Sequence, residues 1–190
     1  MIKVNKVKLF TQLIIAEIFI IIALISVFVV DSCIDNSKYS EILITESSLI
    51  YTENKSVPFT GKKQDTLYNN IILEFDVVDG FKQGDFIMLT MEGNYAVRGH
   101  MNKNKNHGNW KYYYDDGQLE CTGNFDNDKP IGKWTWFYKN GSKKCEGNFI
   151  NGKEEGRWLK FDDLGFPCLL INYSMGEIIS MIKINNLMNV

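Results

Sequence analysis

The residues that could carry out chemistry are few, and their spacing does not fit a reaction centre. The chain has 190 residues and two histidines, His100 and His107. Neither has a cysteine or histidine at zinc-site spacing or a partner for a base or a nucleophile, so a turn histidine is the simpler interpretation of His107. Two aspartate pairs, Asp115–Asp116 and Asp162–Asp163, lie in short loops. Calcium needs about six oxygen ligands, whereas Asp is common in hairpin turns. The sequence therefore predicts no catalytic, metal or cofactor site, and no enzyme.

Cysteine chemistry is limited to one terminal candidate. Cys33 ends an apolar segment and is a candidate for lipidation. Cys121 and Cys145 are 24 residues apart, at equivalent positions of successive hairpins. Two strand spacings separate such residues by roughly 9.5 Å, beyond the ~7 Å Cα limit of a disulfide. We expect both to be small core residues.

The charge of the chain argues against a nucleic-acid surface. The net charge is −2, and the lysines are interleaved with Asp and Glu. A nucleic-acid surface normally has a clustered basic face. The aromatic residues, 13% of the chain, concentrate in residues 58–179, so a buried core is expected there.

A 24-residue period organises the chain from Gly108 to Gly165. The glycine and tryptophan of a Gly-x-Trp triplet return at this spacing, at Gly108, Trp110, Gly132, Trp134, Gly156 and Trp158. Glycine also returns at 117, 141 and 165, and phenylalanine at 125 and 149. A fixed period of this length indicates a stack of identical units. Weaker matches extend the array to about five units, over 61–83, 84–107, 108–131, 132–155 and 156–179.

Each unit has the sequence of a β-hairpin. Residues 134–138 are aromatic and favour a strand. Asn140-Gly141 is a hairpin turn signal, and residues 143–149 return as a second strand. Pro130 is expected in a connecting loop. The predicted fold is therefore all-β: an elongated antiparallel sheet of tandem hairpins, preceded by an N-terminal hydrophobic helix.

Side-chain alternation predicts different residues on the two faces of this sheet. Glycine in a strand at 99, 123 and 147 suggests that a neighbouring Trp ring covers it. Leu89, Tyr113, Phe137 and Phe161 follow each Trp position by three residues, so regular strands direct them to the opposite face. On a solvent-exposed face they would form a partner-binding strip. The alternatives are a bulge that reverses their direction, or a covering segment.

Residues 1–33 have the composition of a signal peptide or membrane anchor. Lys3, Lys6 and Lys8 precede a run that is apolar from Ile18 to Val30 except for Ser26. Two alternatives remain: a lipoprotein signal cleaved before Cys33, or an uncleaved signal anchor. The lysines place the repeats on the outer side of the membrane by the positive-inside rule.

The remaining boundaries follow from composition. Residues 34–57 read as a polar spacer with a possible leading strand, and 58–179 as the repeat domain. Residues 180–190 form a C-terminal cap or tail. The apolar residues of 175–184 fit a final strand over the open edge of the sheet.

The segment Cys145–Gly156 resembles a MORN repeat, with Glu146-Gly147, Phe149, Gly152 and Gly156 at the positions of that pattern. The Trp after the closing glycine resembles the bacterial variant found in YwqK-type antitoxin proteins. The resemblance covers roughly residues 58–179. It implies a non-catalytic β-hairpin sheet that acts as a scaffold or binding surface.

Two functions are compatible with these features. One is a membrane-attached repeat module that binds a protein partner at the cell envelope. The alternative, implied by the resemblance, is an antitoxin-type protein that neutralises a partner toxin by binding. An exported protein would not meet a cytosolic toxin, so residues 1–33 favour the first function.

Overall fold

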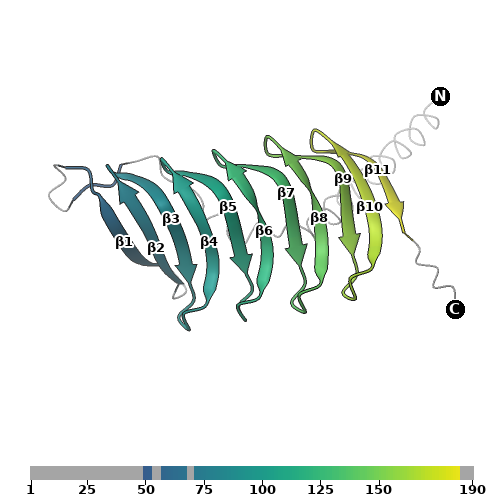
Figure 1. The fold of residues 1–190 in the computed structure, drawn as a ribbon, viewed down its shortest axis with the longest axis horizontal. Coiled ribbons are helices and arrows are strands. Elements are labelled where there is room, and N and C mark those ends of the chain that lie inside the picture. Colours follow the sequence, from purple (N-terminus) through teal and green to yellow (C-terminus); the bar gives the residue numbers. More distant parts are fainter. Residues whose placement is uncertain (1–48, 53–56, 68–70, 185–190) are drawn as a thin grey trace, which may run out of the picture. The chain divides into compact units, whose positions relative to one another are not determined.

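The computed structural model describes residues 49–52, 57–67 and 71–184. Within these residues the chain forms one sheet of eleven antiparallel strands whose spatial order is their order in the sequence (Figure 1). The strands are β1 (Gly61–Leu67), β2 (Ile71–Val78), β3 (Phe81–Leu89), β4 (Tyr95–Asn102), β5 (Lys105–Tyr113), β6 (Leu119–Asp126), β7 (Lys129–Phe137), β8 (Lys143–Ile150), β9 (Lys153–Phe161), β10 (Pro167–Ser174) and β11 (Glu177–Lys183). The predicted all-β meander is confirmed.

The predicted N-terminal helix and Cys33 lie outside the described residues. Among the residues that are described, no helix has the length and apolar character needed to span a bilayer. Tyr51, in the predicted spacer, pairs with Pro58 in a single antiparallel bridge.

Two kinds of turn alternate along the sheet, and each kind lies at one end of the strands. The turns after β2, β4, β6, β8 and β10 have two central residues with positive φ, as at Asn151 (52°) and Gly152 (85°). Two successive positive φ values define a type I′ turn, whose twist matches that of the flanking strands. The turns after β3, β5, β7 and β9 are longer and end in a glycine with positive φ, such as Gly141 (82°) in the predicted Asn140-Gly141 turn.

The type I′ turns also connect neighbouring hairpins. The N–H of Gly152 donates to the carbonyl of Pro130, 3.0 Å away, and Asp128 donates in the same way to Asn106 at 3.1 Å. The Asp128 carboxylate in addition accepts the N–H of Asn106 at 2.7 Å. Hydrogen bonds therefore join successive hairpins at this end of the strands as well as along the strands.

Pro130 lies inside β7, and the prediction that it lies in a connecting loop is wrong. It pairs with Phe125 of β6. At the equivalent position of β5, the N–H of Asn106 bonds the side chain of Asp128 rather than the strand ladder. Proline, which has no N–H, therefore removes no ladder bond at this position. Gly152 stands where Asp128 stands one repeat earlier, so no side-chain acceptor is left there without its donor.

The core lies on one face of the sheet and is aromatic. Trp110, Trp134 and Trp158 are at most 5% exposed. The Trp134 ring contacts Trp136 at 5.7 Å between centroids and Phe125 edge-on at 5.0 Å. Similar contacts run from Phe75 to Tyr173 through successive strands. Edge-to-face and offset contacts at these distances add stability beyond the burial of area.

Each tryptophan ring of the triplets covers a glycine, as predicted. A Cβ added to Gly99, Gly123 or Gly147 would overlap the ring of Trp110, Trp134 or Trp158, respectively. The ring is also fixed by its indole N–H, which in Trp134 donates to the carbonyl of Asn124 at 3.2 Å. The glycine therefore makes room for a ring that packs flat on the backbone.

The glycine of each Gly-x-Trp triplet forms a β-bulge. Three residues of β7, 132–134, lie between the pairs that flank Gly123 on β6. Gly132 has a φ of 63°, which side-chain-bearing residues rarely adopt. The bulge shifts Trp134 onto the neighbouring strand, over Gly123. These glycines lie within strands and not in the turns.

The last strand is β11, which crosses the predicted boundary between repeat domain and tail at residue 180. Its register with β10 shifts near Asn172, which leaves Ile179 without a cross-strand partner there. This bulge at Ile179 interrupts the alternation of side chains along β11.

Candidate functional site

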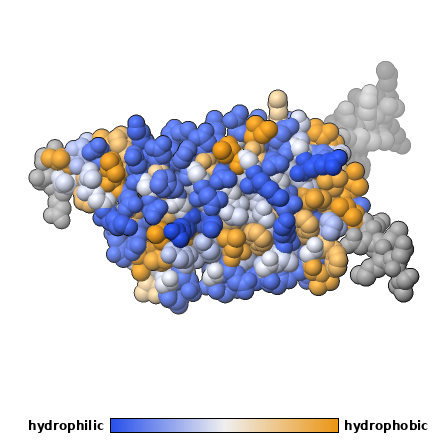
Figure 2. Space-filling view, viewed as in Figure 1, coloured by the Kyte–Doolittle hydropathy of each residue, from blue (hydrophilic) through white to orange (hydrophobic). Residues whose placement is uncertain are grey.

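The face opposite the tryptophans carries a cross-strand row of varied side chains. Directly paired residues share a face, and successive pairings link one residue from each of ten strands: Glu74, Ile87, Arg98, Lys111, Thr122, Thr135, Glu146, Leu159, Leu170 and Ile182. We call this side of the sheet the variable face. Figure 2 shows a largely hydrophilic surface, with hydrophobic side chains gathered over the last strands.

The predicted strip lies at one end of the strands of the variable face. Leu89, Tyr113, Phe137 and Phe161 are all half-buried. Within β5, alternation sends Tyr113 away from the buried Tyr112. A register shift does occur at this level, but the extra residue is on the partner strand: Trp136 pairs with Cys145 and Phe137 with Lys143, which leaves out Lys144. The strip residues therefore keep the alternation of their own strands.

Near the N-terminal end of the strip, two tyrosine rings lie close to each other and to an arginine side chain. The rings of Tyr95 and Tyr113 lie 5.9 Å apart. The guanidinium of Arg98 lies 5.8 Å from the centroid of the Tyr95 ring. Burial raises the pKa of the Tyr113 hydroxyl, and the nearby Arg98 charge opposes this shift only in part. Tyr113 is therefore a neutral, partly desolvated aromatic side chain at neutral pH.

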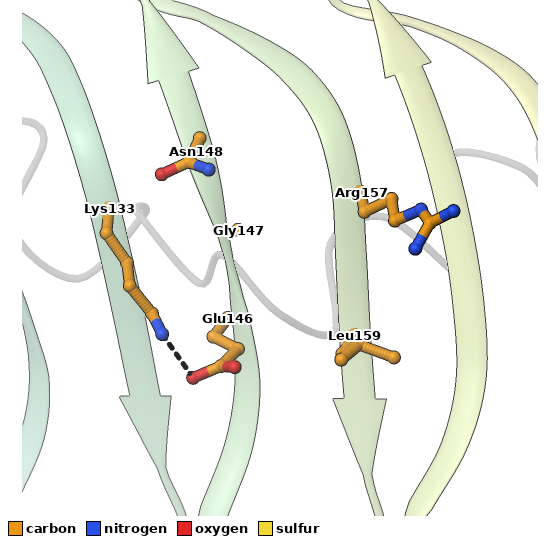
Figure 3. A pocket seen from close by; sticks show the side chains of 6 residues that line it. All are labelled: Lys133, Glu146, Gly147, Asn148, Arg157 and Leu159. Carbon is orange, nitrogen blue, oxygen red and sulfur yellow. Dashed lines mark ion pairs between the residues drawn. The ribbon is translucent and has the colours of Figure 1, made fainter.

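A shallow pocket of about 120 Å³ opens on the variable face over β7, β8 and β9 (Figure 3). Lys133, Glu146, Asn148, Arg157 and Leu159 line it, around the bare backbone of Gly147. The side-chain position of Gly147 faces the core, where the ring of Trp158 lies, so on the variable face this residue contributes only backbone. The pocket offers two cations, one carboxylate and one apolar side chain.

The carboxylate in this pocket is held ionised by two lysines. Glu146 accepts the Lys133 and Lys143 ammonium groups at 3.0 and 2.9 Å. Burial alone would raise the pKa of Glu146, but these hydrogen bonds and charges outweigh it and lower the pKa. Glu146 is therefore not expected to act as a proton donor at neutral pH.

The other polar candidates are dispersed over the sheet. His100 and His107 pair across β4 and β5, each beside one aspartate: Asp85 at 3.7 Å and Asp126 at 3.5 Å. Asp162 lies in a turn, where its carboxylate accepts the N–H groups of Leu164 and Phe166. In the described part of the chain, no three His, Cys, Asp or Glu residues are grouped so that they could hold a metal ion.

The cysteines of the repeats belong to the core. Cys121 and Cys145 are 6% and 1% exposed, and no disulfide joins them to each other or to Cys168. Burial raises the pKa of the Cys121 thiol well above its usual value. A thiol of this kind is a poor nucleophile, and it acts here as a small apolar side chain.

Two features of the variable face were missed by sequence reasoning. The contact between Tyr95 and Arg98 lies within β4, where the register shift at Ala96 brings both residues to one face. The pairing of Arg98 with Lys111 depends on the register of β4 and β5. The bulge at residues 108–110 shifts that register, so strict alternation does not reveal which residues meet. The Gly-x-Trp triplet is the sequence signal that could have revealed this register, because its glycine marks the bulge.

Comparison with known proteins identifies the repeats. The family described as "MORN repeat variant" matches residues 106–127 and 130–151. These two stretches hold β5–β6 and β7–β8 almost entirely. No curated protein matches the chain.

Solved structures match with low similarity. The GtfA/B complex bound to UDP and GlcNAc is 13% identical, with a TM-score of 0.32 over 76% of this chain and 29% of that one. A mutant of S. aureus TarM in complex with Fondaparinux, alpha-GlcNAc-glycerol and UDP is 11% identical, with a TM-score of 0.24 over 64% and 19%. A further TarM structure has a TM-score of 0.21 at 11% identity, over 64% and 21%. The chain spans less than a third of the length of each of these proteins.

Proposed function

Residues 106–151 carry two repeats that match the MORN repeat variant, and from this premise we propose that the chain is a non-catalytic module whose variable face binds a partner protein at the cell envelope. The observation that carries the proposal is the row of half-buried side chains at Leu89, Tyr113, Phe137 and Phe161. Aromatic residues and arginine are enriched in protein interfaces, and a polar rim around them is typical. The variable face has this composition.

Attachment at the envelope rests on the sequence of residues 1–33. A basic start followed by an apolar run is typical of a signal or an anchor. The test is fractionation of cells that express the wild-type chain or the Cys33→Ala variant. We expect the wild type in the membrane fraction. Lipid labelling of the wild type that is lost in the variant would identify a lipoprotein. A wild type that is at the membrane without a lipid label would identify an uncleaved anchor.

Partner binding is tested by photo-cross-linking in those cells. A photo-reactive residue is placed at Asn148, exposed beside the pocket of the variable face, and a control at Lys63, whose cross-strand partner Phe75 is buried on the opposite face. We expect a specific adduct from position 148 alone. The adduct should be lost when Tyr113, Phe137 and Phe161 are all changed to Ser while the circular dichroism spectrum stays β-rich.

Two outcomes would contradict this function. Adducts that form equally from positions 148 and 63 would indicate non-specific contact. An adduct that survives the triple substitution would show that the strip does not contribute to binding.

The antitoxin-type alternative uses the same face and differs in compartment. If the wild-type chain fractionates with soluble cytosolic proteins, the envelope proposal fails and neutralisation of a cytosolic toxin becomes the better proposal. The same photo-cross-linking pair then identifies whether a toxin is the partner.

A further inference from the structure

The variable face places two positive charges directly opposite each other. Arg98 on β4 pairs with Lys111 on β5, and both side chains are exposed. Residues paired in this way have Cβ atoms about 4.5–5.5 Å apart, where like charges are destabilising. Within the residues that the structure describes, neither cation has a carboxylate at salt-bridge distance. No carboxylate of the described residues therefore offsets this repulsion.

The repeat geometry does not require cations at these two positions. The equivalent pair is Glu74 and Ile87 one repeat earlier. It is Thr122 and Thr135 one repeat later, and Glu146 and Leu159 after that. The hairpins fold with neutral, acidic or apolar side chains there. A like-charged pair at one position therefore points to a role outside the sheet.

The neighbouring side chains give this pair the chemistry of an interface anchor. Tyr113 follows Lys111 by two residues on β5 and so lies on the same face. Its ring lies 5.9 Å from that of Tyr95, and Arg98 lies over Tyr95 at 5.8 Å. Arginine and tyrosine are the residue types most often found where binding energy concentrates. Half-buried Ile87 and Leu89, paired with Arg98 and Tyr95, extend the patch with apolar surface.

We propose that the cluster of Tyr95, Arg98, Lys111 and Tyr113 receives an acidic segment of the partner protein, with carboxylates at the two cations and apolar side chains against the tyrosines. This inference rests on the proposed function, because it names the chemistry of the partner at the same face. A nucleic acid fits less well, since the row continues from Lys111 to the uncharged pair of Thr122 and Thr135.

The first test measures binding of defined peptides to the full-length protein in neutral detergent by calorimetry. The probe is a blocked ten-residue peptide of alternating glutamate and valine, and its counterpart has lysine in place of glutamate. We expect the glutamate peptide alone to bind, and less tightly at high salt because the cations are exposed. The double variant Arg98→Gln, Lys111→Gln should bind it about tenfold more weakly.

The matched control is the double variant Lys63→Gln, Lys105→Gln. It removes the same charge from exposed positions of β1 and β5 outside the cluster. We expect it to bind the glutamate peptide like the wild type. Equal losses in the two variants, no loss in either, or equally tight binding of a ten-nucleotide oligothymidine would overturn the inference.

The second test separates this inference from the proposed function. The Arg98→Gln, Lys111→Gln variant is combined with the photo-reactive residue at position 148. Loss of the adduct, with the melting temperature unchanged or raised, supports an acidic contact. An adduct that persists leaves the partner-binding proposal standing and overturns the acidic segment. No adduct in the wild-type background overturns the proposed function itself.

Discussion

On one face of the sheet the same buried side chains return every 24 residues, whereas on the other face the recurring strip lies beside a cross-strand row whose residues differ from hairpin to hairpin. The recurring face holds Trp134 over Gly123 and Trp158 over Gly147. On the variable face, the position of Arg98 becomes Thr122 and then Glu146. Both faces use the same backbone and the same register. The comparison teaches that packing constrains one face and leaves the other available for recognition.

The largest expected effect comes from filling the space beneath a tryptophan. Gly123→Val places a side chain where the Trp134 ring lies, and overpacking of this kind costs about 3 kcal/mol. The adjacent Asn124→Val adds the same side chain to the variable face, where a surface change stays within about 0.5 kcal/mol. Urea unfolding of both variants measures the difference. Similar free energies of unfolding would mean that the two faces are not constrained differently.

A smaller effect is expected from the bulge that delivers each tryptophan. In Gly132→Ala the new methyl group meets no atom within 4 Å, so only the backbone resists it. The left-handed conformation, with φ at 63°, costs an L-residue roughly 1–2 kcal/mol. Thermal unfolding measures this loss. D-Alanine introduced at the same position by semisynthesis should restore stability, and a protein equally destabilised by both enantiomers would refute the backbone explanation.

The smallest effect belongs to the variable face and depends on pH. Because the pKa of Glu146 is lowered in the folded chain, its ionised form stabilises the fold above its usual pKa of 4.5. This contribution is lost as the pH falls through the folded-state value. Its size is under about 1 kcal/mol, since the pair with Lys133 and Lys143 is partly solvated.

The measurement compares melting temperatures of the wild type and Glu146→Gln between pH 7 and pH 3. The gap between them should close on acidification. Glu177→Gln, an exposed change on β11, serves as the control. A gap for Glu146→Gln that stays constant with pH would show that its charge is not the cause.

The sequence predicted most of the recurring face because its signals are local and repeated. The 24-residue period, the Asn140-Gly141 turn and the Trp rings over glycine all follow from spacing and alternation. The position of Pro130 within a strand was not predictable in this way. A strand accepts proline there because the N–H at the equivalent position, in Asn106, bonds the next hairpin and not the strand ladder, which spacing alone does not show.

The variable face was predictable only in part. The strip at Tyr113 and Phe137 follows from alternation within one strand. The pair of Arg98 and Lys111 does not, because the bulge at Gly108 adds residues to β5 and changes which residues meet. Pairing across a bulge depends on backbone dihedral angles that residue counting cannot supply.

Strictly sequential strand pairing has a consequence for how the chain reaches this structure. Every strand bonds only to the one before it and the one after it. No step of assembly has to wait for a distant segment, so the entropy lost in closing each loop is small. Hairpins can therefore add one after another as the polypeptide is made, each using its predecessor as a template.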